Sequence, residues 1–102
     1  MYIEDKSQGL VGHAVIGRVT FSKTGRSIHY QGRTFQSQNG RGFKSNYFEV
    51  ATGSEFWISG CRKDGADRLY KGGPPVLIDE DVREEYWKEI RELPTLRDRA
   101  SY

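Results

Sequence analysis

Short runs of β-branched and aromatic residues, separated by turns that contain glycine, constrain this chain more than any other feature. The 102 residues include 12 Gly and only 3 Pro. Glycine at this frequency suits tight turns, and many short strands with such turns favour β architecture over a helical bundle. A chain of this length is expected to fold as a single domain around one modest core. We therefore expect a mainly β protein.

The clearest hairpin lies in residues 46–59, NYFEV-ATG-SEFWIS. A three-residue loop of Ala51, Thr52 and Gly53 suits a type I turn that ends in a left-handed glycine. A two-residue loop would instead mix apolar and acidic side chains on each face, because a register slip moves every side chain to the other face. The three-residue loop pairs Tyr47 with Trp57. The predicted inward set is Phe48, Val50, Phe56 and Ile58, and the outward set is Tyr47, Glu49, Glu55 and Trp57.

A second hairpin is predicted between residues 14–21 and 27–31, which flank a turn at Thr24 and Gly25. The even length of this connection places Phe21 opposite Ile28. The remaining predicted elements are a strand at 33–37, a loop at 38–42, a polar loop at 60–75 that turns at Asp64-Gly65, and a short strand at 76–78.

One helix is predicted at about 80–93, where the apolar residues recur at helical spacing. Asp79 or Asp81 is expected to cap its N-terminus, the latter in a capping box with Glu84. Pro94 ends the helix, and residues 95–102 form a polar tail that is expected to fray. The predicted inward stripe is Val82, Tyr86, Ile90 and Leu93.

These elements predict a mainly β (α+β) fold with five to six strands and one C-terminal helix. The preferred architecture is a small SH3-like barrel that the helix caps, and the alternative is a curved antiparallel sheet with the helix on one face. Residues 1–94 form the predicted single domain. The chain has one cysteine, and its first residues lack the charged and apolar regions of a signal peptide. No apolar run approaches the ~20 residues that cross a bilayer. We expect a cytoplasmic protein that makes no membrane contact.

The sequence contains no established catalytic or metal-binding pattern. Cys61 could act as a nucleophile with His13 or His29 as its base, but no spacing supports this, and a lone cysteine after a strand is typical of a small core residue. Two His and one Cys do not form a common zinc pattern. We therefore expect no catalytic residue and no cofactor.

Three carboxylates, Glu55, Asp64 and Asp67, are candidate ligands for a divalent cation. The stretch Asp-Gly-Ala-Asp lacks the ligand spacing of an EF-hand loop, so solvated acids paired with Arg62 or Arg68 explain it better. The glycine-rich stretches GRGFK and YKGGPP lack the ending of a phosphate-binding loop. We expect no metal site.

Charge is distributed unevenly along the chain. Residues 1–77 carry 11 Lys/Arg and 6 Asp/Glu, whereas residues 78–102 carry 5 and 8, and residues 17–48 contain no acid. Such a charge asymmetry is informative about binding partners and not about the fold. A positive sheet surface with interleaved aromatic rings is typical of proteins that bind RNA or single-stranded DNA. The plainer interpretation is an ordinary solvated surface with Phe43 in the core. The candidate nucleic-acid-binding residues are Arg18, His29, Arg33, Arg41 and Lys44.

The preferred hypothesis is a non-catalytic binding module that engages another protein. Its predicted partner-binding residues are Tyr47 and Trp57, edged by Arg62 and Lys63. Trp, Tyr and Arg are the residue types that most often anchor interfaces. An inhibitor of the immunity or antitoxin type would fit this description, and RNA or single-stranded DNA binding is the alternative. A competing structural interpretation is that the loop at 60–75 covers Trp57.

The segment YFEVATGSEFWISGCRKDGADRLY, with IGRVTFSKTG before it and IDEDVREEYW after it, resembles an uncharacterised family of bacterial proteins of similar length. The WISGCRKDG-x-D-RLY core carries the resemblance, which implies a self-contained domain. Members of this family often bear the label deoxyxylulose-phosphate synthase. That enzyme is several times longer and binds thiamine diphosphate through a Gly-Asp-Gly motif that this chain lacks. Phe56 stands where the resemblance implies Tyr beside Trp57.

Overall fold

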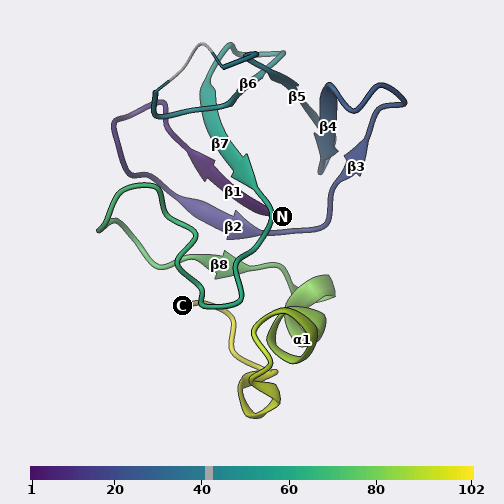
Figure 1. The fold of residues 1–102 in the computed structure, drawn as a ribbon, viewed down its shortest axis with the longest axis vertical. Helices are drawn as coiled ribbons and strands as arrows, with labels where there is room; N and C mark the ends of the chain where they lie inside the picture. Colours follow the sequence, from purple (N-terminus) through teal and green to yellow (C-terminus); the bar gives the residue numbers. More distant parts are fainter. Residues whose placement is uncertain (41–42) are drawn as a thin grey trace.

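The computed structural model describes residues 1–40 and 43–102 and confirms a mainly β fold with a short C-terminal helical segment (Figure 1). In these residues eight strands, more than the sequence predicts, form one sheet. The strands are β1 (Tyr2–Asp5), β2 (Ala14–Ile16), β3 (Thr20–Phe21), β4 (Ser27–Tyr30), β5 (Arg33–Ser37), β6 (Tyr47–Glu49), β7 (Glu55–Ser59) and β8 (Leu77–Ile78). The helical segment comprises η1 (Glu80–Val82), α1 (Arg83–Glu85) and η2 (Tyr86–Ile90), and a 3-10 turn, η3 (Pro94–Leu96), follows it.

The sheet is curled into a half-barrel. Its strand order is β3-β4-β5-β6-β7-β1-β2-β8, in which only β2 and β8 pair in parallel. The strands β2 and β3 lie far apart in this order, although only the residues 17–19 separate them in the sequence. One bent stretch of chain therefore connects the end strand β3 to β2, the strand beside the opposite end of the sheet. At the bend a Cβ on Gly17 would lie 2.4 Å from the Tyr30 ring, so this position requires glycine.

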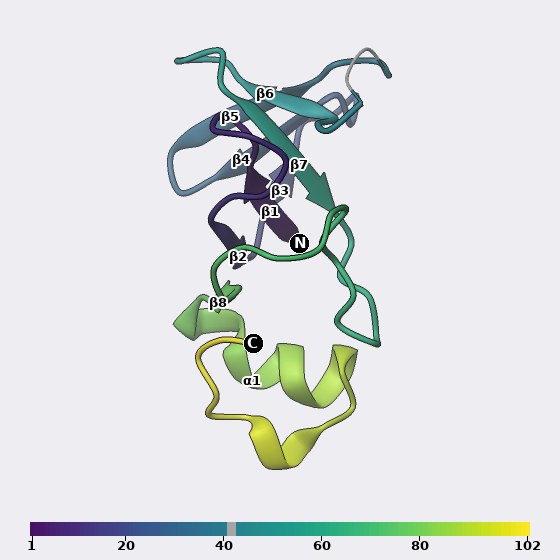
Figure 2. The ribbon, with the colours of Figure 1, turned by 90° about the vertical axis from the view of Figure 1, so that its left-hand side faces the viewer.

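The sheet has an apolar core on each face. Alternation along β1 sends Ile3 to one face and Tyr2 to the other. The barrel core, inside the curl, consists of Ile3, Ile28, Tyr30, Phe35, Phe56 and Ile58. The helix core consists of Tyr2, Ala14, Ile16, Val76, Ile78, Val82, Tyr86 and Trp87. Figure 2 shows the helical segment below the sheet. The predicted single core is thus wrong, because the helix packs on the face opposite Phe56 and Ile58.

Of the two predicted hairpins, one has the predicted register and the other does not. Phe21 lies opposite Ile28 as predicted, and β5 has the predicted bounds. The predicted register of β6 and β7 is wrong by one residue. In the structure Tyr47 pairs with Phe56, and the Glu49 amide donates to the Ser54 carbonyl. The loop therefore holds four residues, 50–53. This slip exposes Val50 and buries Glu49, whose carboxylate is paired with Arg33.

The helical segment ends earlier than predicted. A π-turn forms at its end, where the Arg91 amide donates to the Tyr86 carbonyl. The wider turn lets the adjacent rings of Tyr86 and Trp87 both enter the helix core, while Leu93 is exposed. The predicted side-chain caps are absent in the described residues, since the Asp79 carboxylate accepts from the Tyr30 hydroxyl instead. No helix in residues 1–40 and 43–102 is long and apolar enough to span a bilayer.

The prediction that residues 95–102 fray is wrong. Ser101 bridges to Leu77, and the backbone groups of Tyr102 and Val76 bond to each other in both directions. The Tyr102 ring stacks on Tyr86 at 5.7 Å, and the Trp87 indole donates to the Arg99 carbonyl. The end of the chain therefore covers the outer edge of β8 (Figure 2).

Candidate functional site

Tyr47 and Trp57 do not form the predicted surface pair. Because Tyr47 lies opposite Phe56, its ring belongs to the barrel side of the sheet, and it is half-buried against the barrel core. Trp57 points to the other face, where it is half-buried against the helix core. The two rings therefore lie on opposite faces of the sheet. The competing interpretation has the loop at 60–75 cover Trp57, whereas in the structure the ring packs against the helix core.

Arg62 and Lys63 are exposed in the loop after β7, but each already has an acidic partner. The Arg62 guanidinium donates to both carboxylate oxygens of Asp64 at 3.1 Å, and Lys63 pairs with Glu92. These contacts raise the pKa of both basic groups. Their positive charge is largely compensated locally, so they offer a weaker anchor than the sequence suggests.

Most of the predicted nucleic-acid-binding residues are also in ion pairs. Arg18 pairs with Glu85 at 2.8 Å, Arg33 makes a bidentate pair with Glu49 at 2.9 Å, and Lys44 lies 3.3 Å from Glu55. His29 is exposed beside Thr34. Arg41 lies outside the described residues. Phe43 is 78% exposed, so it is not the core residue that the plainer interpretation expects.

The groups considered for catalysis or metal binding have structural partners. Cys61 is half-buried against the helix core, and burial raises the pKa of its thiol, which disfavours a reactive thiolate. Asp67 accepts from the Arg62 amide and from the Tyr102 hydroxyl. Among the described residues, no cluster of three or more His, Cys, Asp and Glu is placed to hold a metal ion.

A buried polar cluster, which the sequence does not predict, lies beside the helix core. Glu4 and Lys6 are fully buried, and the Glu4 carboxylate accepts from Tyr2 at 2.6 Å and pairs with Lys6 at 3.1 Å and Arg68 at 3.0 Å. Lys6 lies 5.2 Å from the centre of the Tyr70 ring. Arg68 and Tyr70, from the WISGCRKDG-x-D-RLY segment, thus serve this cluster. The cluster fastens the loop at 60–75 to β1. The one sequence signal for this cluster is the presence of the charged residues Glu4 and Lys6 in a short run near the N-terminus.

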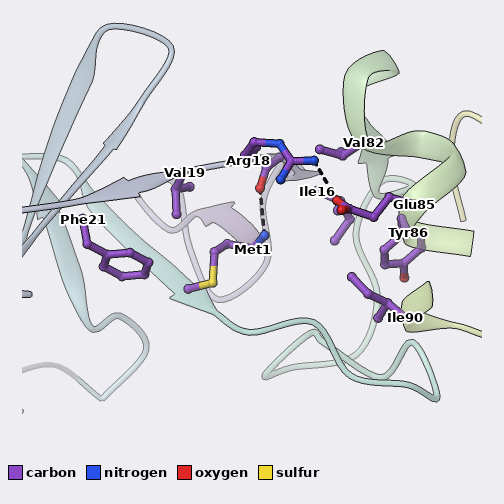
Figure 3. Close-up of a pocket in the computed structure, with 10 residues that line it drawn as sticks. Met1, Ile16, Arg18, Val19, Phe21, Val82, Glu85, Tyr86 and Ile90 are labelled. Atoms are coloured by element: carbon purple, nitrogen blue, oxygen red, sulfur yellow. Dashed lines mark hydrogen bonds and ion pairs between the residues drawn. The ribbon is translucent and has the colours of Figure 1, made fainter.

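The described structure has a groove between β3 and the helical segment, with a volume of about 210 Å³ (Figure 3). It follows the seam between the two cores. Met1 and Val19 line its sheet side and pack against the barrel core, and Val82 and Ile90 line its helical side. Phe21 lies at the sheet end and is 55% exposed, although it stands opposite the fully buried Ile28. The groove thus combines apolar walls with one uncovered aromatic ring.

The free edge of β3 borders this groove. In the described chain β3 pairs with β4 alone. The Ser22 amide bonds to the Ser27 carbonyl, so by antiparallel alternation Phe21 occupies a position whose backbone N–H and C=O point away from β4. An edge with unpaired backbone groups is a template for another extended chain.

One acidic side chain, Glu85, lines the helical side of the groove. Asp81 and Glu89 do not line it, but each is the chain neighbour of a lining residue, Val82 and Ile90 respectively. Glu85 pairs with Arg18 across the groove (Figure 3). Asp81 and Glu89 are exposed, and neither has a Lys or Arg partner among the ion pairs of the described residues. Uncompensated negative charge therefore lies next to the helical wall, while the acid within the wall is paired.

Comparisons with known proteins add no relative: no protein-family model, curated protein or solved structure matches the chain.

Proposed function

We propose that this protein is a non-catalytic binding module that engages another protein through the groove between β3 and the helical segment. The observation that supports this proposal is the position of Phe21: a ring more than half exposed, set against apolar walls and beside an unpaired strand edge. An exposed aromatic ring loses hydrophobic stabilisation unless a partner covers it. The proposal keeps the protein partner predicted from the sequence and moves the surface away from Tyr47 and Trp57.

RNA or single-stranded DNA binding is the second candidate. It is supported by the strongly exposed Phe43 and by Lys23 and Arg26, which are exposed near the β3–β4 turn and have no acidic partner in the described ion pairs. It is weakened by the ion pairs of Arg18, Arg33 and Lys44 described above. A nucleic-acid partner would be bound with steeply salt-dependent affinity.

Affinity capture with the full chain tests the proposal. Tagged protein is incubated with a bacterial lysate with and without nuclease, and bound partners are identified and then purified for direct binding measurements. Phe21→Ala removes the ring in the groove. Phe43→Ala is the matched control, because Phe43 is also exposed but does not line the groove. Thermal unfolding of both variants confirms that each remains folded.

We expect to capture a protein partner whose binding survives nuclease treatment. This partner should bind Phe43→Ala as tightly as the original chain. It should bind Phe21→Ala about tenfold or more weakly. Capture that nuclease abolishes would instead favour the nucleic-acid candidate. A partner that binds Phe21→Ala undiminished would show that the groove is not the binding surface.

A further inference from the structure

We infer that the groove takes an extended segment of another protein that pairs with the free edge of β3 and carries Lys or Arg residues toward the helical wall. This inference rests on the proposed function and specifies the partner that the groove accepts. Three features argue for it: the backbone of β3, the apolar floor and the charge of the helix.

The backbone argues for an extended partner. Phe21, which lines the groove, directs its N–H and C=O away from β4, and no strand of the described chain uses them. An incoming strand would satisfy both groups by β-augmentation, in which main-chain hydrogen bonds supply affinity and alternate side chains supply specificity. By contrast, the outer edge of β8 is covered by residues near the end of the chain. In the described residues the β3 edge is therefore the free end of the sheet.

The side chains argue for an apolar anchor with basic neighbours. One face of an incoming strand would meet the apolar groove lining, where Val19, Phe21 and Ile90 supply the contact. The helical wall contains Glu85, and the exposed Asp81 and Glu89 beside that wall have no cationic partner in the described ion pairs. Charge complementarity therefore selects lysine or arginine and rejects acidic residues at the positions that approach the helix.

The experiment selects the partner chemistry directly. A library of random peptides displayed on phage is panned against the full chain and, in parallel, against Phe21→Ala, and peptides enriched only by the original chain are synthesised. Each synthetic peptide is then measured in three forms: unmodified, with Glu in place of its Lys or Arg residues, and with N-methyl groups on alternate backbone amides.

We expect enriched peptides that contain Lys or Arg beside apolar residues. Replacing their cations by Glu should lower affinity about tenfold, because it removes the charge complementarity, and backbone methylation should do the same, because it removes main-chain hydrogen bonds. Glu89→Gln should weaken binding about two- to fivefold, whereas Asp98→Asn, which removes an exposed acid from the C-terminal segment, should not. Hydrogen exchange at the Phe21 amide should slow on binding.

The outcomes separate this inference from the proposed function. Enriched peptides that are acidic, or that bind without protecting the Phe21 amide, would overturn the extended basic partner while leaving the groove as a protein-binding surface. A library in which no peptide discriminates the original chain from Phe21→Ala would overturn both.

Discussion

The two faces of the sheet bury their side chains in different ways. The barrel core joins strands that are not adjacent: Phe35 of β5 and Phe56 of β7 lie on either side of β6, and their ring centres are 4.8 Å apart. The helix core instead joins β1 and β2 to the end of the chain, and a buried cluster around Glu4 and Arg68 adjoins it. Both sides also contain an ion pair between residues distant in sequence, but Arg33 of the barrel-side pair is 42% exposed, whereas Glu4 and Lys6 on the helix side are fully buried.

This difference explains where a partner surface can arise. Within each core the side chains cover one another. At the seam between the barrel core and the helix core they do not, and the groove lies there. Its sheet side belongs to the barrel core and its helical side to the helix core. A partner that fills the groove would contact both, so binding should stabilise the contact between the two parts of the fold.

The largest expected effect is in the barrel core. Phe56→Ala removes a buried ring that stacks edge-on against Phe35, and we expect a loss of about 3–5 kcal/mol in the free energy of unfolding. Chemical denaturation at neutral pH measures it. Val50→Ala is the matched control, since Val50 was predicted inward but is exposed, and it should cost less than about 0.5 kcal/mol. Equal losses would contradict the observed register of β6 and β7.

The buried polar cluster should rank next. Glu4→Gln leaves Lys6 and Arg68 buried without a carboxylate, and breaking a buried ion pair in this way costs about 3 kcal/mol or more. Because the cluster fastens the loop at 60–75 to β1, hydrogen exchange should accelerate first in β1 and residues 60–75 and only later in β4 and β5. Uniform acceleration throughout the sheet would argue against two separately stabilised faces.

Alkaline pH should weaken the fold through three buried or half-buried tyrosines. Burial, together with hydrogen bonds to Glu4, Asp79 and Asp67 respectively, raises the pKa of Tyr2, Tyr30 and Tyr102. Since the folded pKa lies above the unfolded one, their contribution is fully present below about pH 10 and is lost as pH rises beyond it.

We expect the free energy of unfolding to fall above about pH 10 by about 1.4 kcal/mol per pH unit for each such tyrosine. Denaturation across alkaline pH, followed with phenolate absorbance, measures the slope. Tyr102→Phe should reduce it by one tyrosine's share. A stability that stays constant through this range would contradict the burial of these hydroxyls.

The two faces also differ in how well the sequence predicts them. The β5 strand and the pair of Phe21 with Ile28 follow from local alternation and turn residues. The β6–β7 register does not, because Val50 looks more suitable for burial than Glu49, and only Arg33, distant in sequence, reverses that preference. The β1 strand, with its buried Glu4, was missed for the same reason: its partners Lys6 and Arg68 become visible only in three dimensions.

The candidate site shows the same limit. The sequence predicts an exposed aromatic residue with basic neighbours, but it cannot show that Tyr47 and Trp57 lie on opposite faces or that Phe21 lies uncovered beside a free edge. Exposure of Phe21 depends on where the helical segment packs, and that is set by Tyr86 and Trp87 together.

Trp57→Ala should have an intermediate effect. A free surface ring would cost less than about 1 kcal/mol on removal, but Trp57 is half-buried against the helix core, so we expect a loss of about 2 kcal/mol. Thermal or chemical denaturation measures it, with Phe43→Ala as a control for an exposed ring. A loss as small as that of Phe43→Ala would restore Trp57 as a candidate binding residue.

The smallest effect is expected at the ion pair that crosses the groove. Arg18 and Glu85 are 59% and 51% exposed, and pairs in such contact with water contribute about 0–1 kcal/mol. Arg18→Gln and Glu85→Gln, with the double variant, form a cycle that measures their coupling by denaturation at low and high salt. We expect less than about 0.5 kcal/mol, decreasing with salt. A coupling of several kcal/mol would mean that this pair fastens the helical segment to the barrel, so a partner could not compete for Glu85 without unfolding the seam. A weak coupling leaves Glu85 available to the basic residues of an incoming strand.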